Sequence, residues 1–173
     1  MLLNDALATV QHYIRADATR TFASVGTAQA IFTNPANGRL TLPVGLYTVD
    51  GLLNIGSMSA TSGNLAFSLL GAGTATLGSI LCHVVGVDGA PGVAATQTGS
   101  TMVAAATPVS AVTAGTGTSC TLNIKGSFEV TVAGTLVPSI TLVTAAAAVL
   151  AVGSYLSIVP RGTVSTVSVG AWS

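Results

Sequence analysis

Apolar and polar side chains alternate strictly in Phe128-Glu129-Val130-Thr131-Val132. A period of two is typical of a β-strand with one buried and one exposed face. A second stretch, Leu46-Tyr47-Thr48-Val49-Asp50, is rich in β-branched and aromatic residues and is bounded by Gly45 and Gly51. Glycines in such places mark the points where strands end or bend. These two stretches predict that the chain folds as β-sheet.

Stretches of the same kind continue on both sides of these two, from about residue 29 onward. Turns are expected at 88–92, 114–118 and 133–135, and a loop over the four alanines at 145–148. The expected strands are 29–33, 39–42, 46–55, 64–70, 74–87, 101–106, 109–113, 120–132, 136–144, 154–160 and 164–169. This organisation predicts an all-β fold, a jelly-roll-like β-sandwich of about eight to ten strands.

The N-terminal segment has a different character, because residues 1–39 hold five of the ten charged residues. A short helix is expected near residues 5–17, with Asn4 or Asp5 as its N-cap. Its apolar residues at helical spacing are Leu3, Leu7, Val10 and Ile14. A helix this short is marginal alone and needs a surface to lie on. We therefore expect residues 1–28 to be an arm or short helix that docks on a partner, or on the chain's own body, and residues 29–173 to be the β-sandwich domain.

The composition restricts the function. The chain has 173 residues, enough for one domain, and a formal net charge of zero. Only 6% of its residues are charged, against about 25% in a typical soluble domain. Lys125 is the only lysine and the four arginines are scattered, so no basic patch for nucleic acid is expected. A surface so poor in charge favours burial against other protein subunits over a free monomer.

Residues 137–159 are apolar enough to suggest a membrane span, and the mean hydropathy of the chain is +0.75. However, Pro138 and Pro160 bracket this run, Gly153 and Ser154 interrupt it, and no basic cluster flanks it. The first residues also lack the basic start of a signal peptide. We therefore expect neither a transmembrane helix nor a membrane partner.

Catalytic constellations are missing from the sequence. It has two histidines, His12 and His83, and five acidic residues, and Asp50 is expected to cap a turn. Cys82 and His83 are adjacent, so a strand would point their side chains to opposite faces. We expect no catalytic residue, no cofactor and no metal site, and hence no enzyme. Cys82 and Cys120 are expected to be small buried apolar residues, with a disulfide between them as the alternative.

Four segments resemble a family of tailed-bacteriophage structural proteins. They are the glycine-bounded strand at 42–53, the Gly-Thr-Leu-Val-Pro strand at 134–140, the Gly-Ser-Tyr-Leu stretch at 153–156, and the terminal Ser-Val-Gly-Ala-Trp-Ser at 168–173. The resemblance extends over about residues 29–173. It implies a jelly-roll-like sandwich, commonly trimeric, that serves in the virion as a head decoration protein, head fibre or tail fibre. No catalytic residues come with it.

The expected function is therefore that of a capsid decoration (cement) protein. It would bind the head shell as a homotrimer and stabilise it, within a virion assembled in the host cytoplasm. Its partners would be the major capsid protein or another virion protein, together with its own copies. The interface candidates are Leu3, Leu7, Val10, Ile14, Tyr47, Tyr155 and Trp172. The alternative is a head fibre, tail fibre or collar protein that binds a host receptor.

Overall fold

A computed structural model of the chain describes residues 11–34, 38–58, 64–89, 96–102, 111–113, 118–143 and 148–162. The described residues form strands and their connections, and none of them lies in a helix long and apolar enough to cross a bilayer. The all-β prediction is confirmed. The strands are β1 (His12–Arg15), β2 (Arg20–Phe22), β3 (Ala28–Ala30), β4 (Leu40–Leu42), β5 (Gly45–Gly56), β6 (Asn64–Ser68), β7 (Thr76–Asp88), β8 (Thr96–Met102), β9 (Ala111–Thr113), β10 (Cys120–Val132), β11 (Gly134–Leu136), β12 (Ser139–Leu142), β13 (Ala148–Leu150) and β14 (Tyr155–Gly162).

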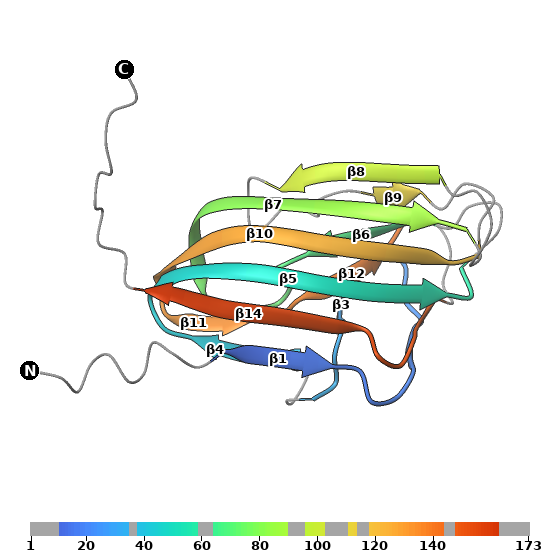
Figure 1. The fold of residues 1–173 in the computed structure, drawn as a ribbon. Coiled ribbons are helices and arrows are strands. Elements are labelled where there is room, and N and C mark those ends of the chain that lie inside the picture. The colour runs from blue at the N-terminus through green and yellow to red at the C-terminus, as the bar shows by residue number, and fades with distance from the viewer. Residues whose placement is uncertain are drawn as a thin grey trace, which may run out of the picture.

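Most of these strands belong to one large antiparallel sheet (Figure 1). Its order is β1-β14-β5-β10-β7-β8, and β13 joins it by pairing with both β5 and β2. The long strand β10 lies at its centre and is paired along its length with β5 on one side and β7 on the other. Its observed bounds, 120–132, are those the sequence predicts.

A smaller sheet of order β3-β12-β6-β9 lies behind the large one, and β11 pairs with β4 (Figure 1). Within the small sheet Phe67 pairs with Ile140 and Leu65 with Leu142, and all four side chains are buried. They belong to the same apolar core as the buried residues of the large sheet. Burial of this apolar surface is the main force that holds the two layers together.

Alternation along the strands of the large sheet separates the core from the solvent side. In β5 the side chains of Tyr47, Val49, Leu53 and Ile55 are buried, whereas those between them are partly or fully exposed. The strands β7, β10 and β14 show the same alternation. The large sheet therefore has one face in the core, and we call its other face the outer face.

The prediction of a helix near residues 5–17 is wrong for residues 11–17, the part of this segment that the structure describes. Residues 12–15 form β1, which is hydrogen-bonded to β14. Tyr13 and Arg15 are exposed, whereas Ile14 is buried in the core of the chain. This alternation of exposed and buried side chains has the period of two that is typical of a strand. The apolar spacing fits a helix, but pairing with a neighbouring strand satisfies the same backbone groups and prevails. Residues 1–10, with Leu3, Leu7 and Val10, lie outside the described residues, and docking by residues 1–28 stays a prediction.

Several short strands were also missed or misplaced. The strands β2 and β13 were not expected, β11 lies where a turn was expected, and β8 begins at Thr96 rather than at residue 101. Three-residue strands carry no periodicity of their own, so their pairing depends on partners distant in sequence. The strand expected at 164–169 lies outside the described residues.

Candidate functional site

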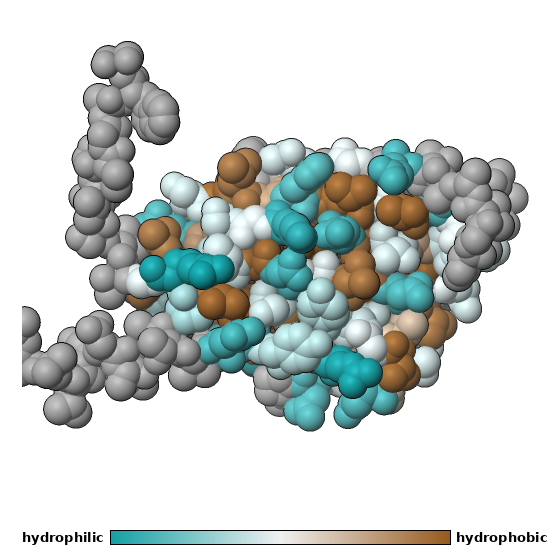
Figure 2. Space-filling model, viewed as in Figure 1, coloured by the Kyte–Doolittle hydropathy of each residue, from teal (hydrophilic) through white to brown (hydrophobic). Residues whose placement is uncertain are grey.

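The outer face of the large sheet extends over six paired strands and is exposed. Figure 2 shows hydrophobic and hydrophilic side chains interspersed over it. Its exposed apolar residues are Tyr13, Leu46, Leu52 and Leu81, with exposed fractions between 40% and 62%. These apolar side chains are spread over several strands and separated by polar ones, so the face offers both apolar and hydrogen-bonding contacts.

Strand register places residues with hydrogen-bonding side-chain groups, including the Tyr13 hydroxyl, in one row across the centre of this face. The row crosses six strands, from β1 at one edge to β8 at the other. Its members, each paired with the next, are Tyr13, Ser157, Asp50, Lys125, His83 and Thr101. The row gives the face hydrogen-bonding groups of both kinds, donors and acceptors. The expectation that Asp50 caps a turn is wrong, because Asp50 lies in the middle of β5.

Asp50 joins three strands of this face. The Tyr155 hydroxyl on β14 donates a 3.2 Å hydrogen bond to Asp50 Oδ1, and Lys125 Nζ on β10 lies 3.8 Å from Asp50 Oδ2. The ring of Tyr155 stacks on that of Tyr13 from β1, with 5.6 Å between ring centroids. The hydrogen bond to the Asp50 carboxylate, and its negative charge, raise the pKa of Tyr155. These three contacts hold the side chains of Tyr13, Tyr155, Asp50 and Lys125 in fixed positions on a surface that faces solvent.

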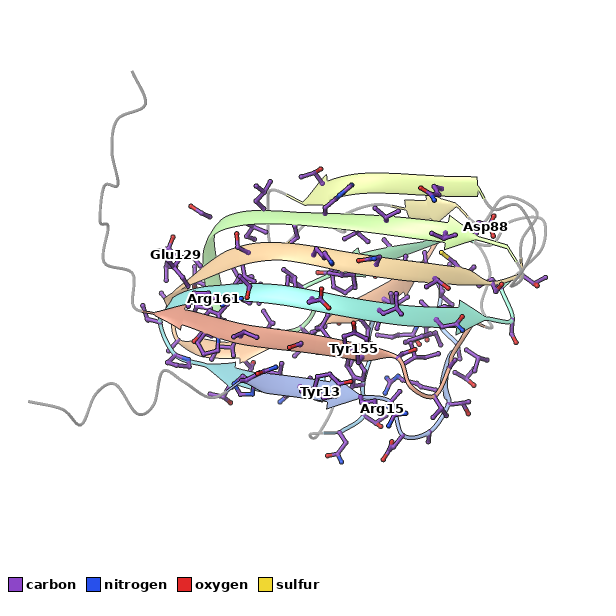
Figure 3. The ribbon with its side chains drawn as sticks, in the orientation of Figure 1. Tyr13, Arg15, Asp88, Glu129, Tyr155 and Arg161 are labelled. Carbon is purple, nitrogen blue, oxygen red and sulfur yellow. The ribbon has the colours of Figure 1, made fainter. Side chains whose placement is uncertain are left out.

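The outer face also holds most of the charge of the described chain. Five of the nine charged residues that the structure describes lie on it: Arg15, Asp50, Lys125, Glu129 and Arg161. Figure 3 shows Glu129 and Arg161 toward one end of the sheet, with Tyr13, Arg15 and Tyr155 near the β1 edge. The Arg161 Nε–H donates a 3.0 Å hydrogen bond to Thr48 Oγ1. The charges are of both signs and nearly balance, which suits contact with a protein surface of mixed character.

The titratable side chains near the centre of the outer face include Asp50, Lys125 and His83. The described residues contain no group of three or more His, Cys, Asp or Glu side chains placed to hold a metal ion. The carboxylate of Asp50 is engaged by Tyr155 and Lys125, and His83 is exposed beside Lys125 in the register.

The predicted interface residues fall into three groups. Tyr155 is half-exposed on the outer face. Ile14 and Tyr47 are buried in the core of this chain, where the Tyr47 ring stacks on Phe128 and its hydroxyl donates to the Pro43 carbonyl. The remaining candidates, Leu3, Leu7, Val10 and Trp172, lie outside the described residues. The sequence reasoning missed Tyr13, Leu52 and Leu81, although strand alternation places Leu52 on the solvent side.

The cysteines lie on the core side of the large sheet, opposite the outer face. Both are free and buried, and they cannot pair in this fold, because Cys82 stands opposite Gly126, six residues along β10 from Cys120. Burial raises the pKa of Cys82 to about 11 and that of Cys120 to about 12. Near Cys120, the negative charge of Asp88 adds to this effect. The prediction of two buried apolar cysteines is confirmed.

Comparison with known proteins adds nothing to this geometry, since no family model and no curated protein matches the chain.

Proposed function

We propose that the protein is a structural component of a tailed-bacteriophage virion, a decoration protein that binds the head shell as a homotrimer and stabilises it. The observation that carries the proposal is the outer face, a broad sheet surface with exposed apolar side chains and charges of both signs. In this view residues 29–173 are a jelly-roll-like sandwich, and the outer face contacts the shell or a neighbouring copy.

The segments that resemble phage structural proteins are neighbours in space. Leu42, in the first segment, pairs with Gly134 at the start of the second. Leu52, at the other end of the first segment, pairs with Tyr155 in the third. A resemblance spread over 115 positions, from 42 to 156, thus gathers on adjoining strands. This supports one structural unit over three unrelated glycine-rich matches.

The energetics of the outer face suit a permanent interface. Covering apolar side chains stabilises an association by about 25 cal/mol per Å² of apolar surface removed from water. Covering unpaired ions costs free energy, so Arg15, Glu129 and Arg161, which form no ion pair among the described residues, would need partners of opposite charge or polar partners on the surface that covers them. A shell presents many identical sites, so contacts that are weak for one copy become strong for an assembled trimer.

The test is binding to phage heads that lack the protein. We expect the purified protein to sediment with such heads, and electron microscopy of the intact particle to show hundreds of copies in symmetric threes. Analytical ultracentrifugation should give a trimer in solution. A monomer without affinity for heads would refute the proposal. A handful of copies per particle, with binding to host cells, would instead identify a fibre or collar protein.

A further inference from the structure

A pocket lies at the β1 edge of the large sheet. It forms where residues 16–19 connect β1 to β2 and pass the segment 31–34 that follows β3. The cavity has a volume of about 40 Å³, and its polar lining residues include Arg15, Asp17, Thr19, Arg20, Thr33 and Asn34. A wider open depression of about 260 Å³ shares Arg15, Asp17 and Asn34 with it and adds Tyr13. Figure 3 shows Tyr13 and Arg15 at this edge.

Arg20 is the unusual residue of this pocket. Its Nε is buried and has no hydrogen-bond acceptor among the described residues, although its guanidinium lies 5.8 Å from the centroid of the Phe22 ring. Within the part of the chain that the structure describes, the one ion pair joins Lys125 to Asp50, so Arg20 has no carboxylate partner there. Desolvation lowers the pKa of Arg20. A partly buried cation without an acceptor costs free energy that a bound anion would offset.

The surroundings of Arg20 add to its positive charge. Arg15 supplies a second guanidinium, also without an ion pair among the described residues. Asp17 brings one negative charge, so the two arginines leave the pocket lining with a surplus of one positive charge. Thr19, Thr33 and Asn34 contribute side-chain hydrogen-bond donors.

We propose that this pocket binds a small oxyanion, with the guanidinium groups of Arg20 and Arg15, which both line it, as its two cations. A space of about 40 Å³ admits a group the size of a carboxylate or a phosphate. Guanidinium groups bind both of these by charge-assisted hydrogen bonds. The acidic side chain of a partner protein and free phosphate are two sources of such a group. The inference does not depend on the proposed role in a virion.

The experiment is an NMR titration of the ¹⁵N-labelled protein with sodium acetate and, separately, with sodium phosphate, at constant pH and ionic strength. We expect the Arg20 Nε–H and the backbone amides of Thr19 and Thr33 to shift saturably. The dissociation constant should be on the order of millimolar, as for a small ion held by a few contacts. Saturation by acetate alone indicates a carboxylate ligand, and saturation by phosphate alone indicates phosphate; either result supports the site.

Variants locate the binding. In Arg20→Gln and in Arg15→Gln, followed through the Thr19 and Thr33 amides, affinity should fall about tenfold or more. Arg39→Gln is the matched control, because Arg39 is exposed and does not line the pocket. If Arg20→Gln does not fold, the wild-type and Arg15→Gln titrations still decide. Shifts that never saturate, or equal affinities in wild type and Arg15→Gln, would overturn the proposal and leave the virion proposal untouched.

Discussion

Tyr155 and Asp50, 105 positions apart in sequence, meet on the outer face through a 3.2 Å hydrogen bond from the tyrosine hydroxyl to Asp50 Oδ1. They are diagonal neighbours, since Tyr155 pairs with Leu52 and Ser157 pairs with Asp50 across β14 and β5. Diagonal side chains of adjacent strands are within reach when one of them is long or aromatic. The contact also receives Lys125 from β10, so one carboxylate joins three strands.

The ionisation of Tyr155 should depend on Asp50. The pKa of Tyr155 is raised from the ordinary value of 10.0 by the hydrogen bond and charge of Asp50, and Asp50→Asn should lower it again. NMR of tyrosines labelled at the ring Cζ would measure this as a function of pH. The pKa of Tyr47, raised by burial, should not respond and serves as the internal control. An unchanged Tyr155 pKa in Asp50→Asn would contradict the contact.

The raised pKa of Tyr155 also makes the free energy of unfolding depend on pH. Because the folded chain holds the Tyr155 proton more tightly than the unfolded chain, this contribution is fully present below pH 10 and is lost as the pH rises through the folded-state pKa. The denaturation midpoint of the wild type should therefore fall more steeply above pH 10 than that of Tyr155→Phe.

Gly126 should be intolerant of a side chain. It lies on β10 between β5 and β7, and an added Cβ would overlap the carbonyl oxygen of Leu81 and the Cα of Cys82. Both are backbone atoms of a paired strand, so relief requires the sheet to move. Gly126→Ala should reduce the free energy of unfolding by about 1–3 kcal/mol, measured by urea denaturation at fixed protein concentration.

The matched control for Gly126 is Gly56, at the end of β5. An added Cβ at Gly56 would meet nothing within 4 Å. Gly56→Ala should change the free energy of unfolding by less than about 0.5 kcal/mol. Equal effects of the two substitutions would mean that the close approach of β7 to Gly126 does not exist in solution.

Neither cysteine should react while the protein is folded. Burial removes Cys82 and Cys120 from reagent, and their raised pKa values keep them as thiols at neutral pH. An aromatic disulfide reagent should modify no thiol in native protein at pH 8 and two per chain in guanidinium chloride. Cys82→Ala and Cys120→Ala should each leave one thiol in denaturant. Rapid modification of the native protein would contradict the burial.

Leu81 should contribute to binding and not to folding. It is 62% exposed on the outer face, and it lies beside Ser127 of β10. Leu81→Gln should leave the free energy of unfolding of the free chain nearly unchanged and weaken binding to heads about tenfold, as expected when one leucine loses its apolar burial. Sedimentation with heads that lack the protein would measure this.

Val152 provides the comparison for Leu81. It is 54% exposed and lies in the turn between β13 and β14 rather than in the sheet. Val152→Gln should bind heads as the wild type does. If Leu81→Gln also binds normally, the outer face is not the surface that contacts the shell.

The sequence alone determined the β class and the central strands. The β-branched and aromatic residues at 46–50, bounded by glycines, and the alternation at 128–132 predicted β5 and β10 almost to the residue. A long strand shows a recognisable hydrophobic pattern in its own sequence, because every second side chain must enter the core whichever strands pair with it. Tyr155 was among the predicted interface residues, whereas Leu52, which the same alternation places on the solvent side, was not.

Only the tertiary structure decided the rest. That residues 12–15 form an edge strand, that Tyr47 lies in the core, and that Asp50 meets Tyr155 all depend on which strands are neighbours and in what register. Hydrogen bonds between strands join residues more than a hundred positions apart, and short segments such as β1 and β13 take their conformation from that pairing. Local sequence cannot encode a partner so distant, and the pocket around Arg20 arises in the same way, from connections that meet only after the sheets have formed.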